Sequence, residues 1–160
     1  MGDLKKLFVM EQTYATLFSL TNKIQVQGDK YFENITSRQF MTMVAIIHLP
    51  KDGTTINNIA RKLGTTKQSV KQLIDILENK GYVVSVPSEQ DKRAVNVLVT
   101  ESGRQAMADC NNTGIKYLED LFNEFSQEEL VLLWCALKKL YRFDGEEMDG
   151  FEEEAPFIQI

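Results

Sequence analysis

Residues 54–103 read TTINNIARKLGTTKQSVKQLIDILENKGYVVSVPSEQDKRAVNVLVTESG, and this stretch decides the fold. It begins with a short helical pattern whose apolar residues share one face: Ile56, Ile59, Ala60 and Leu63. Gly64 is a typical helix stop, and Thr65 or Thr66 offers a hydroxyl to cap a second helix. The second helix, residues 67–80, has apolar residues at the same spacing: Val70, Leu73, Ile74 and Leu77. Two short helices joined by a tight, glycine-containing turn predict a helix-turn-helix.

Two apolar runs follow Gly81 and predict a β-hairpin. Residues 82–86 and 95–99 are rich in valine, which favours strands. Between them, residues 87–94 read PSEQDKRA, a segment too charged to bury and too long for a two-residue turn. A helix-turn-helix followed by a hairpin with a basic tip predicts a winged helix, whose second helix can enter the major groove of DNA.

The wing and the segment before the helix-turn-helix resemble the MarR family of bacterial transcription regulators. That family has an Asp-x-Arg element, an apolar strand and Leu-Thr-x-x-Gly; here residues 91–93 read DKR and residues 94–99 read AVNVLV. Residues 100–103 then read TESG, with Val99 standing where the family often has leucine. Residues 35–40, ITSRQF, resemble the family's Leu-Thr-x-x-Gln-aromatic helix opening. The resemblance implies a winged-helix regulator of transcription.

Long helical patterns flank this module on both sides. The first has an apolar stripe: Leu7, Met10, Tyr14, Leu17 or Phe18, Thr21 and Ile24. After the wing, Thr100 is expected to cap one long helix with one face formed by Met107, Cys110, Gly114, Leu118, Leu121 and Phe125. Ser126 and Glu129 form a capping box that opens a last helix, whose inward face we expect to be Leu130, Leu133, Trp134, Leu137, Leu140 and Tyr141.

These flanking helices are more apolar than one winged helix requires. In the MarR family such helices interlock two subunits, so residues 1–30 and 104–143 are expected to be dimerisation helices. The expected interface residues are Leu7, Tyr14, Phe18, Trp134 and Leu137. The apolar pattern by itself fits a larger monomeric core equally well. The predicted fold class is therefore mainly α with a small β wing: one domain over residues 1–160 with its winged helix-turn-helix in residues 54–103.

Length and composition fit a soluble, single-domain protein. The chain has 160 residues, of which 43% are hydrophobic and 26% are charged. No apolar run approaches the roughly 18 residues of a membrane span, and the N-terminal residues lack the apolar core of a signal peptide. Cys110 and Cys135 have no disulfide-framework or CxxC spacing. We expect a cytoplasmic protein without a membrane partner.

The net charge of −5 argues at first against a nucleic-acid partner. Its distribution reverses that argument, because residues 54–104 contain eight Lys and Arg against five Asp and Glu. This stretch therefore carries +3 and the rest of the chain −8. Residues 144–154 supply seven acids, and we expect residues 144–160 to form an acidic tail. A positive patch on an acidic body is the electrostatic footprint of a DNA-binding protein.

The predicted DNA contacts lie on the second helix and the wing: Thr66, Lys67, Gln68, Ser69, Lys71, Gln72, Asp91, Lys92 and Arg93. Hydroxyls near a helix N-terminus suit phosphates, glutamine can pair with adenine, and lysine binds guanine or phosphate. Lys92 is expected at a phosphate. Arg93 is expected to enter a narrow minor groove while Asp91 accepts from its guanidinium, as in the family's Asp-x-Arg pair. The alternative readings are a solvated helix face and a surface ion pair without function.

Other chemistry has little support in the sequence. His48 is the only histidine, and a zinc site needs several ligands within reach, so we expect no metal and a structural role for His48. Cys110 and Cys135 fall on apolar helical faces and are expected to be buried small hydrophobes. No Gly-x-Ser-x-Gly, phosphate loop or nucleophile–base set is present, so we expect no enzyme activity and no cofactor.

The sequence therefore predicts a sequence-specific regulator that binds double-stranded DNA as a homodimer and represses transcription at a palindromic operator. The resemblance implies a small apolar or aromatic effector, and its candidate pocket residues are Tyr14, Phe18, Phe40, Met43 and Tyr117. Two alternatives stay open. One is a winged-helix module that docks a protein partner through its acidic surface or tail. The other is a redox-sensing regulator of the same family that uses a cysteine.

Overall fold

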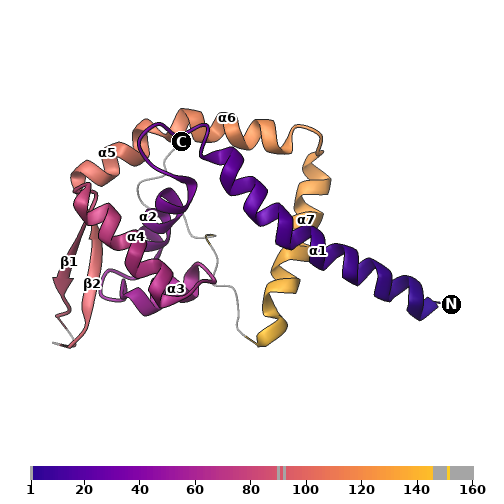
Figure 1. Ribbon diagram of the computed structural model, residues 1–160, viewed down its shortest axis with the longest axis horizontal. Coiled ribbons are helices and arrows are strands. Elements are labelled where there is room, and N and C mark those ends of the chain that lie inside the picture. Colours follow the sequence, from indigo (N-terminus) through magenta and orange to yellow (C-terminus); the bar gives the residue numbers. More distant parts are fainter. Residues whose placement is uncertain (1, 90, 92, 146–150, 152–160) are drawn as a thin grey trace.

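The computed structural model describes residues 2–89, 91, 93–145 and 151 (Figure 1). It confirms the predicted fold class, since the chain is mainly helical with one two-stranded antiparallel sheet. The elements in chain order are α1 (Gly2–Gly28), α2 (Ser37–His48), α3 (Ile56–Lys62), α4 (Lys67–Asn79), β1 (Val83–Pro87), β2 (Val95–Val99), α5 (Glu101–Asp109), α6 (Asn111–Phe122), α7 (Gln127–Tyr141) and the 3₁₀ turn η1 (Arg142–Asp144).

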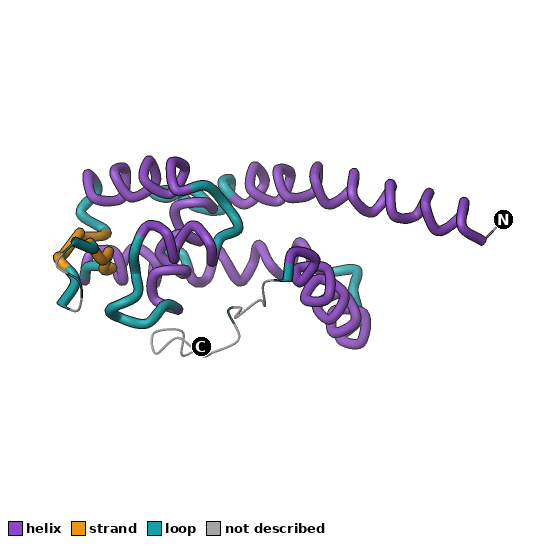
Figure 2. Tube along the Cα trace, turned by 90° about the horizontal axis from the view of Figure 1, so that it is seen from below, coloured by secondary structure: helices purple, strands orange, loops and turns teal. Residues whose placement is uncertain are grey.

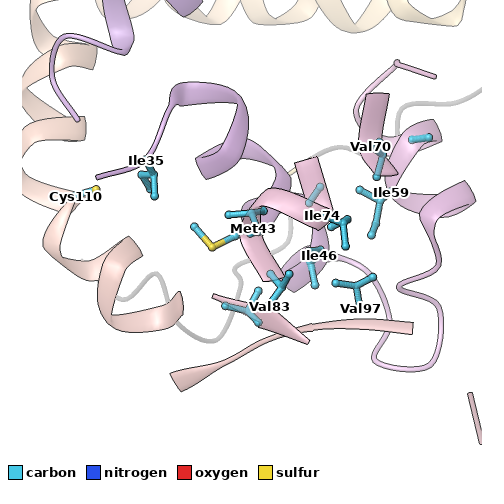
Figure 3. Packing of buried hydrophobic residues seen from close by; sticks show 13 residues of the cluster. Ile35, Met43, Ile46, Ile59, Val70, Ile74, Val83, Val97 and Cys110 are labelled. Carbon is cyan, nitrogen blue, oxygen red and sulfur yellow. The ribbon is translucent and has the colours of Figure 1, made fainter. Parts of the chain in front are cut away.

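The hydrophobic core lies where α2, α3, α4 and the hairpin meet (Figure 3). Its largest fully buried apolar side chains are Met43, Ile59, Val70, Leu77 and Val97. Each stabilises the fold by about 1.5–3 kcal/mol relative to an exposed position. Because these side chains fix the inner faces of α3 and α4, the opposite face of α4 is left toward solvent.

Capping hydrogen bonds fix the helix starts, and they confirm those predicted at Thr100 and Ser126. Thr36 forms a capping box with Gln39, in which the Thr36 hydroxyl accepts from the Gln39 N–H (3.2 Å) and the Gln39 side chain accepts from the Thr36 N–H (3.3 Å). Thr100 accepts from the Gly103 N–H at the start of α5 (3.0 Å). Ser126 and Glu129 form the predicted capping box of α7. Each such cap contributes about 1 kcal/mol and fixes where its helix begins.

The hairpin is joined closely to α5 by Gly103. In the hairpin Val83 pairs with Val99, and the Tyr82 carbonyl accepts from the Thr100 N–H (3.0 Å). A Cβ on Gly103 would overlap that same carbonyl oxygen. Only glycine therefore lets α5 start against the base of the wing, which gives a physical reason for the final residue of the Leu-Thr-x-x-Gly motif.

The prediction of one continuous helix after the wing is wrong. Helix α5 ends at Asp109, and α6 begins at Asn111. Cys110 between them has ψ −9°, which departs from the helical value near −42°. The cause lies in residues 110–114, CNNTG, all of which are weak helix formers.

The predicted apolar stripe of α1 and the predicted inward face of α7 are not buried by the described part of this chain. Tyr14 and Phe18 on α1 are 73% and 70% exposed, and Trp134 and Leu137 on α7 are both 38% exposed. Figure 2 shows the N-terminal part of α1 extending well beyond the winged helix, where no other helix or strand of residues 2–145 lies beside it. The expectation of an inward α7 face fails because the periodicity defines an apolar face without supplying a neighbour for it. None of the helices in the described ranges is both long and apolar enough to cross a membrane.

Candidate nucleic-acid interface

The helix-turn-helix is formed by α3, the turn at Gly64 and α4. Thr55 caps α3 by accepting from the Asn58 N–H (3.3 Å), and Thr66 caps α4 by accepting from the Ser69 N–H (3.1 Å). Gly64 lies in the left-handed region with φ +61°, as a glycine stop signal predicts. This turn sets α4 across α3 and presents its polar face outward.

Four predicted contact residues lie side by side on the exposed face of α4. Lys67 and Lys71 are one turn apart, as are Gln68 and Gln72, and all four side chains are exposed. None of these four side chains forms a hydrogen bond or ion pair with another residue in the described part of the chain. Their donors and acceptors are therefore available to a partner.

The two predicted hydroxyls on α4 are already engaged. Thr66 Oγ1 accepts from the backbone as the helix cap. Ser69 Oγ accepts from the guanidinium of Arg38, which reaches across from α2 (2.9 Å). Each hydroxyl retains its own proton to donate. Arg38 was missed by the sequence reasoning, because it lies 31 residues before Ser69 and no local pattern joins them.

Arg38 adds a cation at the start of α4. Its side chain is exposed, and it lies beside the first turn of α4, where backbone N–H groups also point outward. Helix N-termini of this kind favour anions, and a guanidinium is a bidentate donor to phosphate. The SRQ start of α2 gives a cation in a helix's first turn, which is the only sequence signal that points to it.

The wing tip differs in one detail from the prediction. Asp91 Oδ1 accepts from the backbone N–H of Arg93 (2.9 Å), whereas the predicted partner was the Arg93 guanidinium. The physical reason is that an aspartate readily closes a local turn onto the backbone two residues later. The Arg93 side chain is exposed and extends from this closed turn. Lys92 lies outside the described residues.

Some cations in the basic stretch are used within the chain. Lys80 Nζ donates to the Asn34 carbonyl (2.7 Å) and to Gln39 Oε1 (3.0 Å), which ties the end of α4 to the start of α2. Arg104 pairs with Glu101 on α5 at 3.6 Å. Both residues count toward the charge of +3, yet they are committed to internal contacts. The cations that remain available are concentrated on α4 and at the wing tip.

The candidate effector residues lie in different environments. Met43 is fully buried in the core, and Phe40 stacks on Phe32 (ring centroids 5.4 Å apart). Tyr14 and Phe18 are exposed on α1, whereas the Tyr117 hydroxyl donates to the Ile24 carbonyl (2.6 Å). One chain therefore does not enclose all five side chains around a common cavity.

Two tyrosines join α6 to the end of α1. Tyr31 and Tyr117 pack at 4.9 Å between ring centroids, and the Tyr31 hydroxyl donates to Asp120 Oδ2 (2.7 Å). The hydrogen bond to Asp120 raises the pKa of Tyr31, and burial raises the pKa of Tyr117. Both hydroxyls therefore stay protonated at neutral pH and keep these bonds.

The cysteines and the histidine have separate roles. Cys110 is buried, as predicted, and burial raises the pKa of its thiol, which disfavours the reactive thiolate. Cys135 is exposed on α7, so the expectation that it is buried is wrong for a single chain; it belongs to the same uncovered helix as Trp134. His48 Nδ1 lies 2.8 Å from the Val44 carbonyl, a structural contact. Among the described residues, no group of three or more His, Cys, Asp or Glu is arranged to hold a metal ion.

Comparison with known proteins agrees with this geometry. Residues 33–94 match the MarR family. The transcriptional activatory protein BadR of Rhodopseudomonas palustris is 26% identical over 130 residues, which cover 79% of this chain and 74% of BadR. The S. aureus MepR–DNA complex superposes with a TM-score of 0.70 at 27% identity, covering 80% of this chain and 95% of that one. Streptococcus pneumoniae FabT in complex with DNA superposes with a TM-score of 0.61 at 26% identity, covering 85% and 97%.

The matched stretch spans α2, the helix-turn-helix and the first part of the wing, where the sequence motifs lie. The structural likeness covers a larger share of the chain, 80% for MepR and 85% for FabT. Both kinds of similarity agree with the motifs at residues 35–40 and 91–103, and over residues 33–94 the chain is similar to the MarR family of winged-helix transcriptional regulators.

Proposed function

We propose that this chain binds a specific site in double-stranded DNA as a homodimer and thereby regulates transcription. The observation that carries the proposal is the uncommitted polar face of α4 beside a wing whose tip exposes Arg93. Two relatives above 25% identity, MepR and FabT, have been solved in complex with DNA and share this fold. A helix held by its apolar face and free on its polar face is suited to the major groove.

In this proposal α4 reads the major groove. Gln68 and Gln72 supply paired donors and acceptors for base edges, while Lys67 and Lys71 reach phosphates or guanine. Thr66 and Ser69 donate their hydroxyl protons to phosphates near the helix N-terminus, and Arg38 adds a further phosphate contact there. The sequence preference of the protein would then depend chiefly on the two glutamines.

The wing reads the minor groove through Arg93. The side chain extends from a turn that is closed by Asp91, so its direction is restricted before DNA arrives. A narrow, A·T-rich minor groove attracts an inserted arginine because its negative potential is enhanced. Lys92 is proposed as a phosphate contact from its sequence position alone.

The flanking helices supply the dimer interface in this proposal. Large apolar side chains are exposed along α1 and α7: Leu4, Leu7, Phe8, Val9, Met10, Tyr14, Phe18, Val131, Leu132, Leu133, Trp134, Leu137 and Leu140. Soluble monomers rarely expose contiguous apolar surfaces of this extent. A second copy would cover them and would place two α4 helices on half-sites about one helical turn apart. A palindromic operator follows from the two-fold symmetry.

The proposal includes a small-molecule effector that binds between the two subunits. Tyr14 and Phe18 are exposed in one chain, so a pocket that includes them would form only against the second subunit. A small apolar or aromatic molecule bound there would change how the two winged helices are spaced and would weaken DNA binding. Repression by occupation of a promoter is the simplest outcome of such binding.

A salt titration tests DNA binding against the protein-interaction alternative. Two subunits should neutralise roughly 6–10 phosphates, so log K should fall with log[salt] with a slope of about −5 to −9. Selection from a randomised duplex library, followed by anisotropy titration of the winner, measures both preference and slope. Binding that is undetectable at low salt, or insensitive to salt, would favour a module that docks a protein partner.

A further inference from the structure

We infer that Asp52, in the connection between α2 and α3, positions the wing arginine through a relay of hydrogen bonds, and this inference rests on the proposed DNA-binding function. The relay starts at Asp52 Oδ1, which accepts from Ser88 Oγ just after β1, where the chain enters the wing tip (3.0 Å). Ser88 Oγ in turn accepts from the backbone N–H of Asp91 (3.2 Å). Asp91 Oδ1 accepts from the backbone N–H of Arg93 (2.9 Å).

Each link of the relay has a fixed direction. A hydroxyl has one proton, and Ser88 gives it to Asp52, which leaves the serine lone pairs for the Asp91 N–H. The carboxylate can only accept, so Asp52 determines how Ser88 is oriented. Since its acceptor is ionised, the first bond is also stronger than a neutral hydrogen bond. The turn that exposes Arg93 is thus oriented by Asp52, which lies 36 residues before Ser88 in the sequence.

The anchor is rigid on its own side. The Thr54 carbonyl accepts from the Val97 N–H of β2 (3.0 Å), and the Gly53 carbonyl accepts from Asn58 Nδ2 of α3 (2.8 Å). Asn96 Nδ2 also donates to Asp52 Oδ1 (2.8 Å). The connection between α2 and α3 therefore joins the strand that leaves the wing to the helix-turn-helix, and it cannot shift independently of either.

The polar cluster formed by Asp52, Ser88 and Asn96 costs free energy that packing alone does not explain. Asp52 Oδ2 and Asn96 Oδ1 are buried and have no hydrogen-bond partner among the described residues. Buried acceptors without partners are unfavourable, and apolar side chains would fill the same volume with less penalty. A polar cluster that is retained at such a cost specifies one geometry, which is what a wing that must enter a groove requires.

The experiment compares full-length variants on two duplexes that differ only in A·T-rich or G·C-rich flanks beside the selected site. Asp52→Ala should lower the flank preference by about five-fold or more, the same effect that is expected of Arg93→Ala, and the double variant should lose no more than either single one. Asp52→Asn keeps an acceptor oxygen and should retain most of the preference. Ile46→Val, a buried core change, is the matched control and should leave the preference unchanged.

Amide hydrogen exchange at Asp91 and Arg93 gives a second readout that needs no DNA. Both amides should be protected in the wild type and in Ile46→Val, and should exchange faster in Asp52→Ala and in Ser88→Ala. If Asp52→Ala does not fold, Ser88→Ala and its rescue by Ser88→Thr answer the same question. Unchanged protection and unchanged flank preference in the folded variants would overturn the relay. If the wild type does not bind DNA at all, the proposed function is overturned instead. The hydrogen-exchange rates would still test whether the relay exists.

Discussion

The guanidinium of Arg38 donates a hydrogen bond to Ser69 Oγ across 2.9 Å and thereby joins the first turn of α2 to the first turn of α4. The bond lies on the solvent side of the helix-turn-helix, next to the outward-pointing N–H groups of α4. An exposed hydrogen bond of this kind contributes little to stability, so its value lies in where it holds the cation. In the DNA-bound protein, that cation would lie beside a phosphate.

Arg38→Ala should weaken binding to all duplexes by a similar factor. Because the residue is proposed to contact a phosphate, the slope of log K against log[salt] should also fall by about one per subunit. Anisotropy titrations at several salt concentrations measure both quantities. Lys116→Ala, which removes an exposed cation from α6, is the control and should change neither. An Arg38→Ala protein with wild-type affinity and slope would show that the contact with Ser69 is only structural.

Arg93→Ala should lose roughly 1–3 kcal/mol of binding free energy, mainly on duplexes with A·T-rich flanks. The side chain is exposed at the wing tip, so the melting temperature should stay the same. Glu89→Ala changes another exposed wing residue and should preserve the flank preference. Equal flank preferences in Arg93→Ala and in the wild type would exclude minor-groove reading by this wing.

Sedimentation at low micromolar concentration should give about twice the chain mass of 18.3 kDa. Leu137→Asp places a charge on the exposed face of α7 and should weaken the dimer by about ten-fold or more, because each subunit loses apolar burial and gains an unpaired charge. Val84→Asp is the matched control, since Val84 is 44% exposed but lies on the wing. A stable wild-type monomer under these conditions would remove the dimer from the proposal.

Gly103→Ala should destabilise the fold by about 1–3 kcal/mol, because the added methyl overlaps the Tyr82 carbonyl and one of the two must move. For Gly114→Ala on α6 we expect the opposite result, an increase in stability. Its Cβ would meet only Phe32 at an ordinary contact distance of 3.7 Å, and alanine favours the helix by roughly 0.5–1 kcal/mol. Urea unfolding monitored by circular dichroism measures both changes, and a stable Gly103→Ala protein would contradict the close approach of α5 to the wing.

Removal of the residues after Phe143 deletes seven acids from each subunit. Less repulsion from the DNA backbone should raise non-specific affinity at physiological salt, while the preferred sequence stays the same. A second variant, Glu152→Gln with Glu153→Gln and Glu154→Gln, neutralises part of this charge without shortening the chain and should act in the same direction. Unchanged non-specific binding in both would mean that these acids do not influence DNA binding.

The features that the sequence predicted correctly are local ones. Helix caps at Thr66, Thr100 and Ser126 depend on a side chain and an N–H three residues later, so spacing reveals them. Gly64 adopts a positive φ, as a helix stop signal predicts. The hairpin strands differ from their predicted bounds by one residue or less.

The features that were missed depend on contacts between distant residues. Arg38 with Ser69, Lys80 with Gln39, and Asp52 with Ser88 join segments more than 30 residues apart, and their side chains have no common pattern. The break at Cys110 was missed because the apolar period continues through it while the helix propensity falls. The period likewise predicted the apolar faces of α1 and α7 without indicating what covers them.

The chain passes from the wing to α7 through α5 and α6. The rotation of α7 relative to the winged helix is therefore set by the number of residues in these two helices. One alanine inserted in the middle of α5 would turn everything beyond it by about 100° and advance it by about 1.5 Å. Three or four inserted residues would nearly restore the phase but would lengthen the path by about 5 Å. In a two-fold dimer, the lengths of α5 and α6 would therefore determine how the two α4 helices are placed relative to each other. That placement in turn limits which spacings of half-sites on the duplex the dimer can bind.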